Sequence, residues 1–353
     1  MRFTVHRQQA GIGRRYSCAT AFGPHPKAFF LPWYRRDRGQ GGTKVNQLAG
    51  RDVIELPALS KSDIDLVLAV SAQFESQLAT QRTIPLLSDY ILATLFYEPS
   101  TRTRLSFEAA MHRLSGRVIS VAEVTSSSVA KGESIDDTAR TIEQYADVLV
   151  MRHPEAGAAH IAAEAVAMPV INAGDGTRNH PTQALLDLYT IAKERGAIDG
   201  QTIAMVGDLK YGRTTHSLAE ALVHYRAKLM LVSPPELSMP ERVLQRLREA
   251  GVTFEVTTDI GRATHEADVM YVTRIQRERF PSPTEYDRVH GVFHIDPALI
   301  ERSRPGLTIM HPLPRVDEIS HEVDAYSGAA YFRQARNGVY VRMALLALVL
   351  GTI

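Results

Sequence analysis

The sequence predicts an α/β protein with two consecutive doubly wound parallel sheets, because short apolar runs alternate with helical stretches in two successive series from Asp52 onward. Buried parallel strands read as continuous apolar runs, since helices cover both faces of their sheet. Arg, His and Gln gather just after the ends of these runs. Ligands of such sheets bind beyond the carboxyl ends of the strands, so we expect the functional site there.

The first series opens with a helical stretch over 60–79. Its strand-like runs are 90–97, 117–121, 147–151 and 170–173. The first run is followed by a helical stretch whose apolar residues fall at i, i+3, i+4 and i+7, namely Phe107, Ala110, Met111 and Leu114. Gly116 is the expected end of this helix. Pro181 and Gly196 bracket a long helix over 182–195, which joins the two series.

The second series repeats the pattern. Strand-like runs occur at 202–206, 228–232, 253–256, 268–273 and 307–310. Helical stretches such as 214–225 and 241–250 separate them. Two series of this length agree with a chain of 353 residues, which exceeds one typical core and suggests two domains.

The composition indicates a soluble, cytosolic enzyme. The chain is 44% hydrophobic and 22% charged, which is ordinary for a globular protein. No segment reaches the roughly 18 apolar residues that a membrane span needs. Cys18 is the single cysteine, which excludes a disulfide framework and a cysteine-rich metal site.

Charge is distributed unevenly. Residues 1–50 carry nine Lys and Arg against Asp37, a net charge of +8, so the remaining chain has a net charge of −7. Glycine and proline are frequent there and no helical or strand period occurs, so we expect residues 1–46 to be a disordered extension. It could be an organellar transit peptide, a basic tail for nucleic acid, or residues translated upstream of a true start near Val45; we favour the last.

The run Ser100 to Arg104 is the strongest local signal. It follows an apolar run and opens a helix, where backbone N–H groups lack internal partners and carry the positive end of the helix dipole. Ser or Thr before a helix is usually a simple cap and Arg on a helix is usually solvated. Three hydroxyls and two guanidiniums exceed what capping requires, so we interpret residues 100–103 as an anion cradle suited to phosphate.

The ends of the other runs are also rich in groups that bind anions. Together they predict one positive cleft for a ligand with several anionic groups. The polar residues at these ends include Glu98, Arg152, His153, His180, Gln183, Asp208, Lys210, Arg213, Arg274, Gln276, Arg279, His311 and Arg315.

Five segments resemble the motifs of the aspartate and ornithine carbamoyltransferases, in that family's order and spacing. The similarity extends from about Asp52 to the C-terminus. The segments are 96–103, 128–133, 151–154, 180–183 and 311–314. The resemblance implies a carbamoyl phosphate-binding domain over 47–185, an aspartate-binding domain over 186–335, and a C-terminal helix over 336–353 that returns to the first domain.

The amino-acid end of the site resembles the aspartate branch of the family. Ornithine members carry Lys where Glu98 stands and Cys where Pro312 stands. Residues 208–214 and 274–276 look like the segments that hold the two carboxylates of aspartate. Physical chemistry agrees, because a dicarboxylate calls for two guanidiniums, whereas the ammonium of a diamino acid calls for an acid.

The resemblance implies transfer of the carbamoyl group of carbamoyl phosphate to the amine of L-aspartate, an early step of de novo pyrimidine biosynthesis. No covalent intermediate, cofactor or metal is expected. The reaction would depend on juxtaposing two anions and on stabilising the developing oxyanion. In this family the departing phosphate is thought to take the amine proton, and no residue is an obvious general base.

The resemblance also assigns residues to roles. Arg102, Thr103, Arg152 and His180 would be catalytic, the last three by donating to the carbonyl oxygen. Gln183 and the backbone carbonyls of Pro312 and Leu313 would accept from the carbamoyl NH₂. The phosphate would be held by Ser100, Thr101, Arg102, Thr103, Arg152 and, from a neighbouring subunit, Ser128 and Lys131. Aspartate would be held by Lys131, Arg213, Arg274, Gln276 and Leu313. Glu98 would bridge to Arg213 and Arg279 when the domains close, and His153, His216 and His311 are interpreted as structural.

Sites shared between subunits imply a homotrimer at least. The sequence leaves open whether trimers pair further through regulatory chains or a dihydroorotase. We expect no nucleic-acid or membrane partner.

Two other functional classes account for only part of the sequence. Residues 207–214 lie between a strand and a helix and have the spacing of a P-loop, but Arg213 stands in the lysine position and Asp208, Lys210 and Tyr211 crowd the turn. A nucleic-acid-binding function for residues 1–50 rests on charge alone, without regularly spaced aromatic residues.

The first prediction concerns the extension. Deleting residues 1–44 should leave turnover and assembly unchanged, because the segment has no periodicity and matches none of the family motifs. Steady-state kinetics and size-exclusion chromatography of the truncated and full chains check this. Loss of soluble assembly on truncation would show that the extension is structural.

Overall fold

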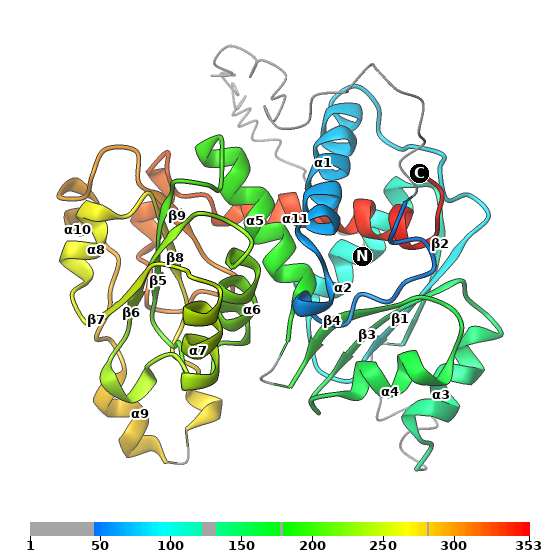
Figure 1. Cartoon of the computed structure of the whole chain (residues 1–353), viewed down its shortest axis with the longest axis horizontal. Helices are drawn as coiled ribbons and strands as arrows, with labels where there is room; N and C mark the ends of the chain where they lie inside the picture. Colours follow the sequence, from blue (N-terminus) through cyan, green and yellow to red (C-terminus); the bar gives the residue numbers. More distant parts are fainter. Residues whose placement is uncertain (1–45, 122–131, 177–178, 281) are drawn as a thin grey trace, which may run out of the picture. The chain divides into compact units, whose positions relative to one another are not determined.

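The structure is a computed structural model that describes residues 46–121, 132–176, 179–280 and 282–353. Within these ranges it contains two parallel sheets with helices packed on them (Figure 1). Residues 1–45, which are all of the predicted extension except Asn46, lie outside the described residues.

The first sheet has the strand order β2-β1-β3-β4 among the described residues, and all its pairings are parallel. The strands are β1 (Ile91–Phe96), β2 (Arg117–Val121), β3 (Val148–His153) and β4 (Val170–Asp175). The helices that accompany them are α1 (Lys61–Leu78), α2 (Thr101–Arg113), α3 (Ile135–Glu143) and α4 (Ala158–Ala165).

Alternating side chains of β1 enter two different hydrophobic cores, as the two-residue period of a strand requires. Leu92 and Phe96 join the core that contains α1 and α2 residues, while Ala93 and Leu95 join the core that contains α3 and α4 residues. Helices therefore cover both faces of the sheet, α3 and α4 on one and α1 and α2 on the other (Figure 1). Burial on both faces explains the continuous apolar run in the sequence.

The second sheet has the order β7-β6-β5-β8-β9 and is also parallel. Its strands are β5 (Thr202–Val206), β6 (Lys228–Val232), β7 (Phe254–Thr257), β8 (Val269–Val272) and β9 (Thr308–Met310). Its helices are α6 (Arg213–Leu222), α7 (Glu241–Glu249), α8 (Ile260–Glu266), α9 (Pro283–Val289) and α10 (Pro297–Glu301). Short 3₁₀ helices occupy Leu56–Ala58, Pro235–Leu237, Arg277–Arg279 and His321–Ala325.

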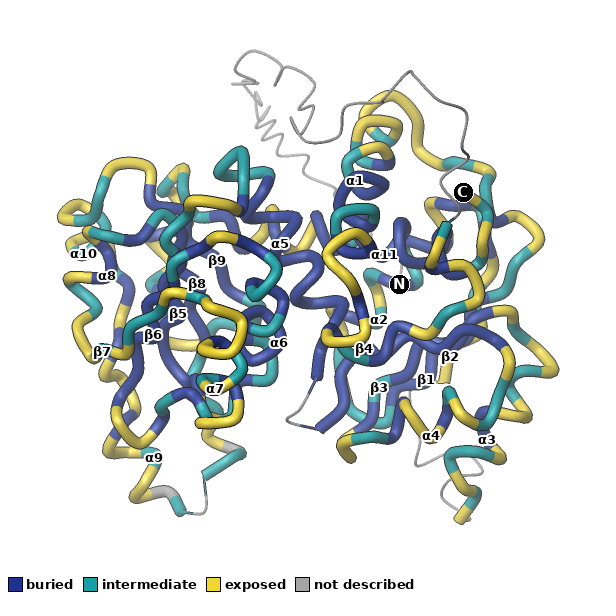
Figure 2. Tube along the Cα trace, viewed as in Figure 1, coloured by how far each residue is buried: buried dark blue, intermediate teal, exposed yellow. Residues whose placement is uncertain are grey.

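Two helices connect the sheets. Helix α5 (Pro181–Arg195) follows β4 and precedes β5, and its residues from Pro181 to Ala192 are buried (Figure 2). Helix α11 (Tyr331–Val349) leaves the second sheet and packs against α1, α2 and α5. The predicted fold class, two doubly wound parallel sheets joined by a long helix with a C-terminal helix packed back on the first part, is confirmed.

Two details differ from the sequence expectation. Helix α2 ends at Arg113, and Ser115 rather than Gly116 takes the left-handed conformation, with φ 65°. Gly116 packs closely against Met111, since a Cβ there would require the end of the Met111 side chain to shift. Strand β3 extends through Arg152 and His153, because β4 continues alongside it to the pair His153–Asp175.

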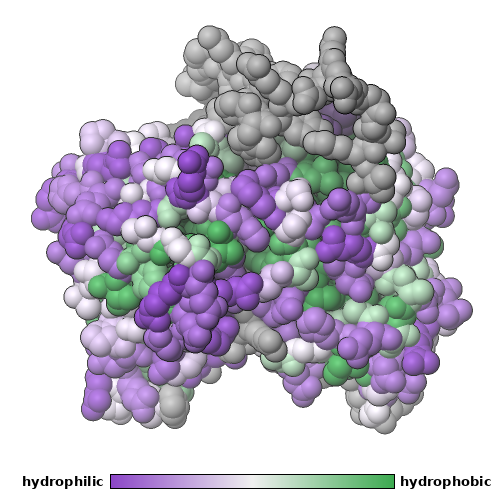
Figure 3. All heavy atoms as spheres, viewed as in Figure 1, coloured by the Kyte–Doolittle hydropathy of each residue, from purple (hydrophilic) through white to green (hydrophobic). Residues whose placement is uncertain are grey.

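The visible face of the surface is predominantly polar (Figure 3). On the face shown in Figure 3, hydrophilic side chains predominate and hydrophobic ones form smaller areas between them. None of the helices in the described ranges combines the length and the apolar character that crossing a membrane requires.

Candidate active site

A cavity of about 850 Å³ lies at the carboxyl ends of strands from both sheets. Its size suits a pair of small ligands. Its walls come from the segment after β1 and the start of α2, from β3, from α5 and α6, from the segments after β8 and β9, and from α11. The polar residues that line it include Glu98, Ser100, Thr101, Arg102, Thr103, Arg152, His180, Gln183, Arg213, Thr214, Arg274, Gln276, Arg279, Gln334 and Arg342.

The anion cradle opens α2 at one side of this cavity. Ser100 is the N-cap residue, yet its hydroxyl makes no capping hydrogen bond. Thr101 and Arg102 are exposed to the cavity and Thr103 is buried. The first-turn N–H groups and the three hydroxyls therefore face a space that an anion can fill.

A second loop, residues 311–314, faces the cradle across the cavity. The Arg102 Nη2 donates to the Leu313 carbonyl at 2.9 Å, and the Leu313 N–H donates to His311 Nδ1 at 2.7 Å. Leu313 has φ 56°, a conformation that disfavours a branched side chain. His311 is buried and its Nε2 lies 2.6 Å from Glu318 Oε1, so this histidine holds the 311–314 loop in place.

Glu98 lies between two guanidiniums. Its Oε2 accepts from Arg152 Nε at 3.0 Å and from Arg213 Nη2 at 3.2 Å. Arg213 also donates to the Gly176 carbonyl at 2.6 Å. Among the described residues the ion-pair partners of Glu98 are thus Arg152 and Arg213, and not Arg279.

The positively charged guanidiniums repel one another in the cavity, which disfavours their protonated forms. Burial, together with the nearby charge of Arg213, lowers the pKa of Arg152 to about 10, although Glu98 opposes the shift. Burial and the charge of Arg274 also lower the pKa of Arg102. A bound anion would relieve this repulsion, since an opposite charge stabilises the protonated form.

His180 is held as a neutral imidazole. It is the N-cap residue of α5, and its backbone N–H donates to Ser217 Oγ at 3.0 Å. The ring Nδ1 is buried and has no hydrogen-bond partner among the described residues. Burial first, and then the charges of Arg213, Arg152 and Arg342, hold its pKa well below the usual value. A neutral histidine in this position donates a hydrogen bond without adding a charge.

The second sheet contributes its own cationic groups. Arg213 begins α6, Arg274 follows β8, and Arg279 ends the short helix Arg277–Arg279. The buried Nε of Arg279 has no hydrogen-bond partner within the described ranges. Gln276 Nε2 lies 3.5 Å from the Tyr211 carbonyl, and all of these side chains except Tyr211 line the cavity.

The structure brings most of the expected site residues together. All but two of the expected site residues line the same cavity. They include Ser100, Arg102, Arg152, Gln183 and Leu313. Ser128 and Lys131 lie outside the described residues. The two remaining histidines have packing contacts: His153 is buried against the Tyr97 ring, and His216 bonds the Leu209 carbonyl and Arg242.

Four polar residues near the cavity were missed in the sequence. Arg342 and Gln334 come from α11, Tyr271 from β8, and Asp187 from α5, and all are buried. Arg342 lies over the Phe107 ring, 5.1 Å from its centroid, and lines the cavity. A signal existed for two of them, because Arg342 and Asp187 are isolated charges inside otherwise apolar helical runs.

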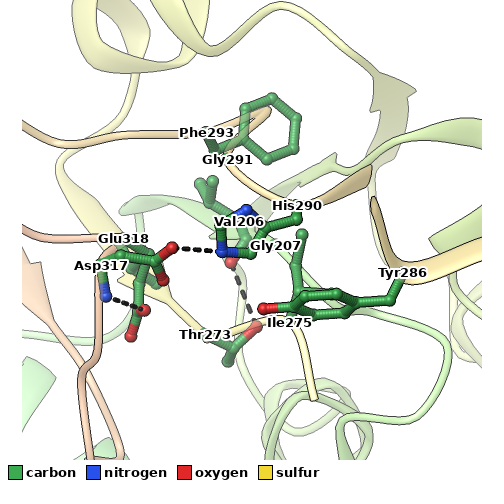
Figure 4. A pocket seen from close by; sticks show the side chains of 11 residues that line it. Val206, Gly207, Thr273, Ile275, Tyr286, His290, Gly291, Phe293, Asp317 and Glu318 are labelled. Atoms are coloured by element: carbon green, nitrogen blue, oxygen red, sulfur yellow. Dashed lines mark hydrogen bonds and ion pairs between the residues drawn. The ribbon is translucent and has the colours of Figure 1, made fainter. Parts of the chain in front are cut away.

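A second cavity of about 20 Å³ lies beside the ends of β5 and β8 (Figure 4). Tyr286, Phe293 and Glu318 line it, and His290 pairs with Asp317 at 2.6 Å at its edge. It offers room for about one water molecule and none for a substrate. No group of three or more potential metal-ligating side chains occurs in the ranges that the structure describes.

Both parts of the chain match one protein family. Residues 51–193 match the carbamoyl phosphate-binding domain of the aspartate/ornithine carbamoyltransferases. Residues 199–349 match the aspartate- or ornithine-binding domain of the same family.

Two relatives are similar over nearly their whole length. The aspartate carbamoyltransferase catalytic subunit of Thermococcus gammatolerans is 57% identical over 304 residues, covering 86% of this chain and 99% of that protein. That of Methanopyrus kandleri is 52% identical over 308 residues, covering 87% of this chain and 99% of that protein.

Solved structures of aspartate transcarbamoylases are also similar to this chain. Aspartate transcarbamoylase from Trypanosoma cruzi, in complex with carbamoyl phosphate and aspartate, is 41% identical with a TM-score of 0.83, covering 87% of this chain and 98% of that one. The catalytic subunit of the M. jannaschii aspartate transcarbamoylase is 50% identical with a TM-score of 0.79, covering 84% and 96%.

The second prediction tests the cradle. Replacing Arg102 with Ala should weaken the binding of inorganic phosphate roughly 10- to 100-fold, because a charge-assisted hydrogen bond contributes about 1.5 to 3 kcal/mol. Titration calorimetry measures this. The matched control is Arg104→Ala on the same helix, since Arg104 pairs with Glu108 and does not line the cavity. Equal phosphate affinity in the two variants would show that the cradle is assigned to the wrong residues.

Proposed function

Because the chain belongs to the aspartate/ornithine carbamoyltransferase family, we propose that it transfers the carbamoyl group of carbamoyl phosphate to the amine of L-aspartate. The products are N-carbamoyl-L-aspartate and phosphate. The observation that carries the proposal is that one cavity holds both the anion cradle of α2 and the guanidiniums of Arg213 and Arg274. Two anionic substrates can therefore lie side by side.

The cradle binds the phosphate end of carbamoyl phosphate. The α2 N–H groups and the hydroxyls of residues 100–103 supply neutral donors, while Arg102 and Arg152 supply charged ones. Arg102 already touches the 311–314 loop through the Leu313 carbonyl. Phosphate binding and placement of that loop are therefore linked through one guanidinium.

Negative charge develops on the carbonyl oxygen as the amine attacks. Thr103, Arg152 and His180 donate to that oxygen, and such preorganised donors are a large part of catalysis in acyl-type transfers. His180 serves as a donor and not as the base. Three arginines would surround any imidazolium formed there, which makes proton uptake unfavourable.

The carbamoyl NH₂ needs acceptors. Gln183 and the carbonyls of Pro312 and Leu313 border the cavity and supply them. Arg213, Arg274 and Gln276 hold the carboxylates of aspartate, which brings its amine to the carbonyl carbon. The carbon–nitrogen bond forms, the carbon–oxygen bond to phosphate breaks, and the departing phosphate takes the amine proton.

Glu98 changes partners during this cycle. In the structure it pairs with Arg152 and Arg213. When phosphate engages Arg152, Glu98 keeps Arg213 and gains Arg279, whose buried Nε has no partner in the described part of the chain. The exchange draws the two substrate-binding parts together.

The proposal extends to assembly and place in the cell. We place the enzyme in the cytoplasm, at an early step of de novo pyrimidine synthesis, and as a homotrimer in which Ser128 and Lys131 serve a neighbouring site. The edge strand β2 supports an interface, because Ile119 and Val121 are exposed on it directly before residues 122–131.

The third prediction tests the reaction itself. With carbamoyl phosphate as donor, L-aspartate should be carbamoylated at least about 100-fold faster than L-ornithine, because ornithine brings an ammonium to guanidiniums that require a carboxylate. Colorimetric assay of the two products measures the ratio. ATP binding and DNA retention are assayed beside it as the alternative activities. A comparable rate of citrulline formation would contradict the aspartate assignment.

The fourth prediction tests the shared site. Mixing Lys131→Ala chains with Arg102→Ala chains should restore about a quarter of wild-type activity, since random mixing pairs a good cradle with a good neighbouring loop at one site in four. Each variant exchanged with itself is the control, and differently tagged chains report the exchange. Parental activity after verified exchange would mean that Lys131 acts within its own chain.

A further inference from the structure

Asp187 is a carboxylate at the centre of a buried polar network next to the cavity. It lies one helical turn after Gln183 on α5 and is fully buried. Its Oδ1 accepts from Gln183 Nε2 at 2.9 Å and from Gln334 Nε2 at 2.7 Å, and its Oδ2 accepts from the Tyr271 hydroxyl at 2.9 Å. Three different elements therefore converge on one side chain.

The first arm of this network fixes the carboxamide of Gln183. A carboxamide has an acceptor and a donor that differ only by a flip about the last side-chain bond. Because Asp187 Oδ1 accepts, the NH₂ of Gln183 must point to it. The Oε1 of Gln183 is then directed away from Asp187, on the side of the residue that lines the cavity.

The second arm fixes the 311–314 loop. Gln334 presents its NH₂ to Asp187, so its Oε1 is left to accept the His311 N–H at 2.9 Å. His311 in turn accepts from the Leu313 N–H. The carbonyls of Pro312 and Leu313 therefore depend on the same carboxylate as the Gln183 amide does.

We propose, on the basis of the function proposed above, that Asp187 is the positioning residue for carbamoyl recognition. By accepting from both glutamine amides, it turns the Gln183 Oε1 toward the carbamoyl NH₂ and holds the backbone carbonyls that accept from the same group. Asp187 touches neither substrate nor phosphate. It determines that this end of the cavity accepts hydrogen bonds and so selects an NH₂ group there.

The arrangement does not depend on the charge of Asp187. Burial raises the pKa of Asp187 to about 7, although its three hydrogen bonds and the charge of Arg342 oppose the shift. Both glutamines bond Oδ1, so a proton on Oδ2 would face only Tyr271. Asn has the same shape and one oxygen acceptor, so Asp187→Asn preserves the orientation of both amides.

Acetyl phosphate separates this role from a general structural one. It keeps the phosphate and the carbonyl but replaces the NH₂ with a methyl group. We compare carbamoyl phosphate affinity with inhibition by acetyl phosphate in wild type, Asp187→Leu, Asp187→Asn and Gln183→Leu. Inorganic phosphate affinity and thermal unfolding are measured in each variant, because the cradle and the fold report general damage.

We expect Asp187→Leu to reduce the preference for carbamoyl over acetyl phosphate about 5- to 10-fold, the size of one hydrogen bond. The loss should be at least as large as that of Gln183→Leu, because Asp187 also holds the 311–314 loop through Gln334, while phosphate affinity stays within about twofold. The double variant should lose no more than Asp187→Leu alone, since Gln183 acts through its contact with Asp187. Asp187→Asn should keep the wild-type ratio within about twofold.

Two results would overturn the proposal: a wild-type ratio in folded Asp187→Leu, or a ratio in Asp187→Asn that falls to that of Gln183→Leu. Where Asp187→Leu does not fold, Asp187→Ala, which also removes the acceptor, takes its place in the same comparison, and Asp187→Asn remains the control that keeps the acceptor. Absence of turnover in the wild type would instead refute the proposed function, so the two failures are distinguishable.

Discussion

Mutual repulsion among guanidiniums is the constraint on which the site depends. Among the described residues, six arginines line the cavity and Glu98 is the one carboxylate; the arginines are Arg102, Arg152, Arg213, Arg274, Arg279 and Arg342. Such a set is stable only with counter-charge. Glu98 supplies part of it by bonding two guanidiniums, and Asp187 is a nearby opposite charge for Arg342. Anionic substrates would add counter-charge, since an opposite charge stabilises the protonated guanidinium.

The fold makes this concentration of charge tolerable. The cationic groups stand at the ends of strands and the starts of helices, while the strands behind them are buried on both faces. Helix α5 is buried from Pro181 to Ala192, which fixes His180 and Gln183 relative to both sheets. Burial and the same repulsion together hold the pKa of His180 well below its usual value, which favours a neutral imidazole that can donate.

The sequence was informative where local patterns carry the structure. Apolar runs located the strands within about two residues, and the segment Ser100 to Thr103 located the cradle before its partners were known. The sequence did not predict the contacts between residues that are far apart in the chain. Gln334 lies 147 positions from Asp187 and bonds it directly. No period or motif predicts that pairing.

The distribution of donors and acceptors connects these observations. A cavity walled by guanidiniums, hydroxyls and helix N–H groups has donors in excess, so the phosphate and carbonyl oxygens of a ligand find partners in several orientations. An NH₂ group finds few. The acceptors offered to it, the Gln183 oxygen and the 311–314 carbonyls, are both tied to Asp187 through glutamine amides. One buried carboxylate therefore sets the orientation of a bound carbamoyl group, since it determines which end of the group lies toward α5 and which lies toward the arginines.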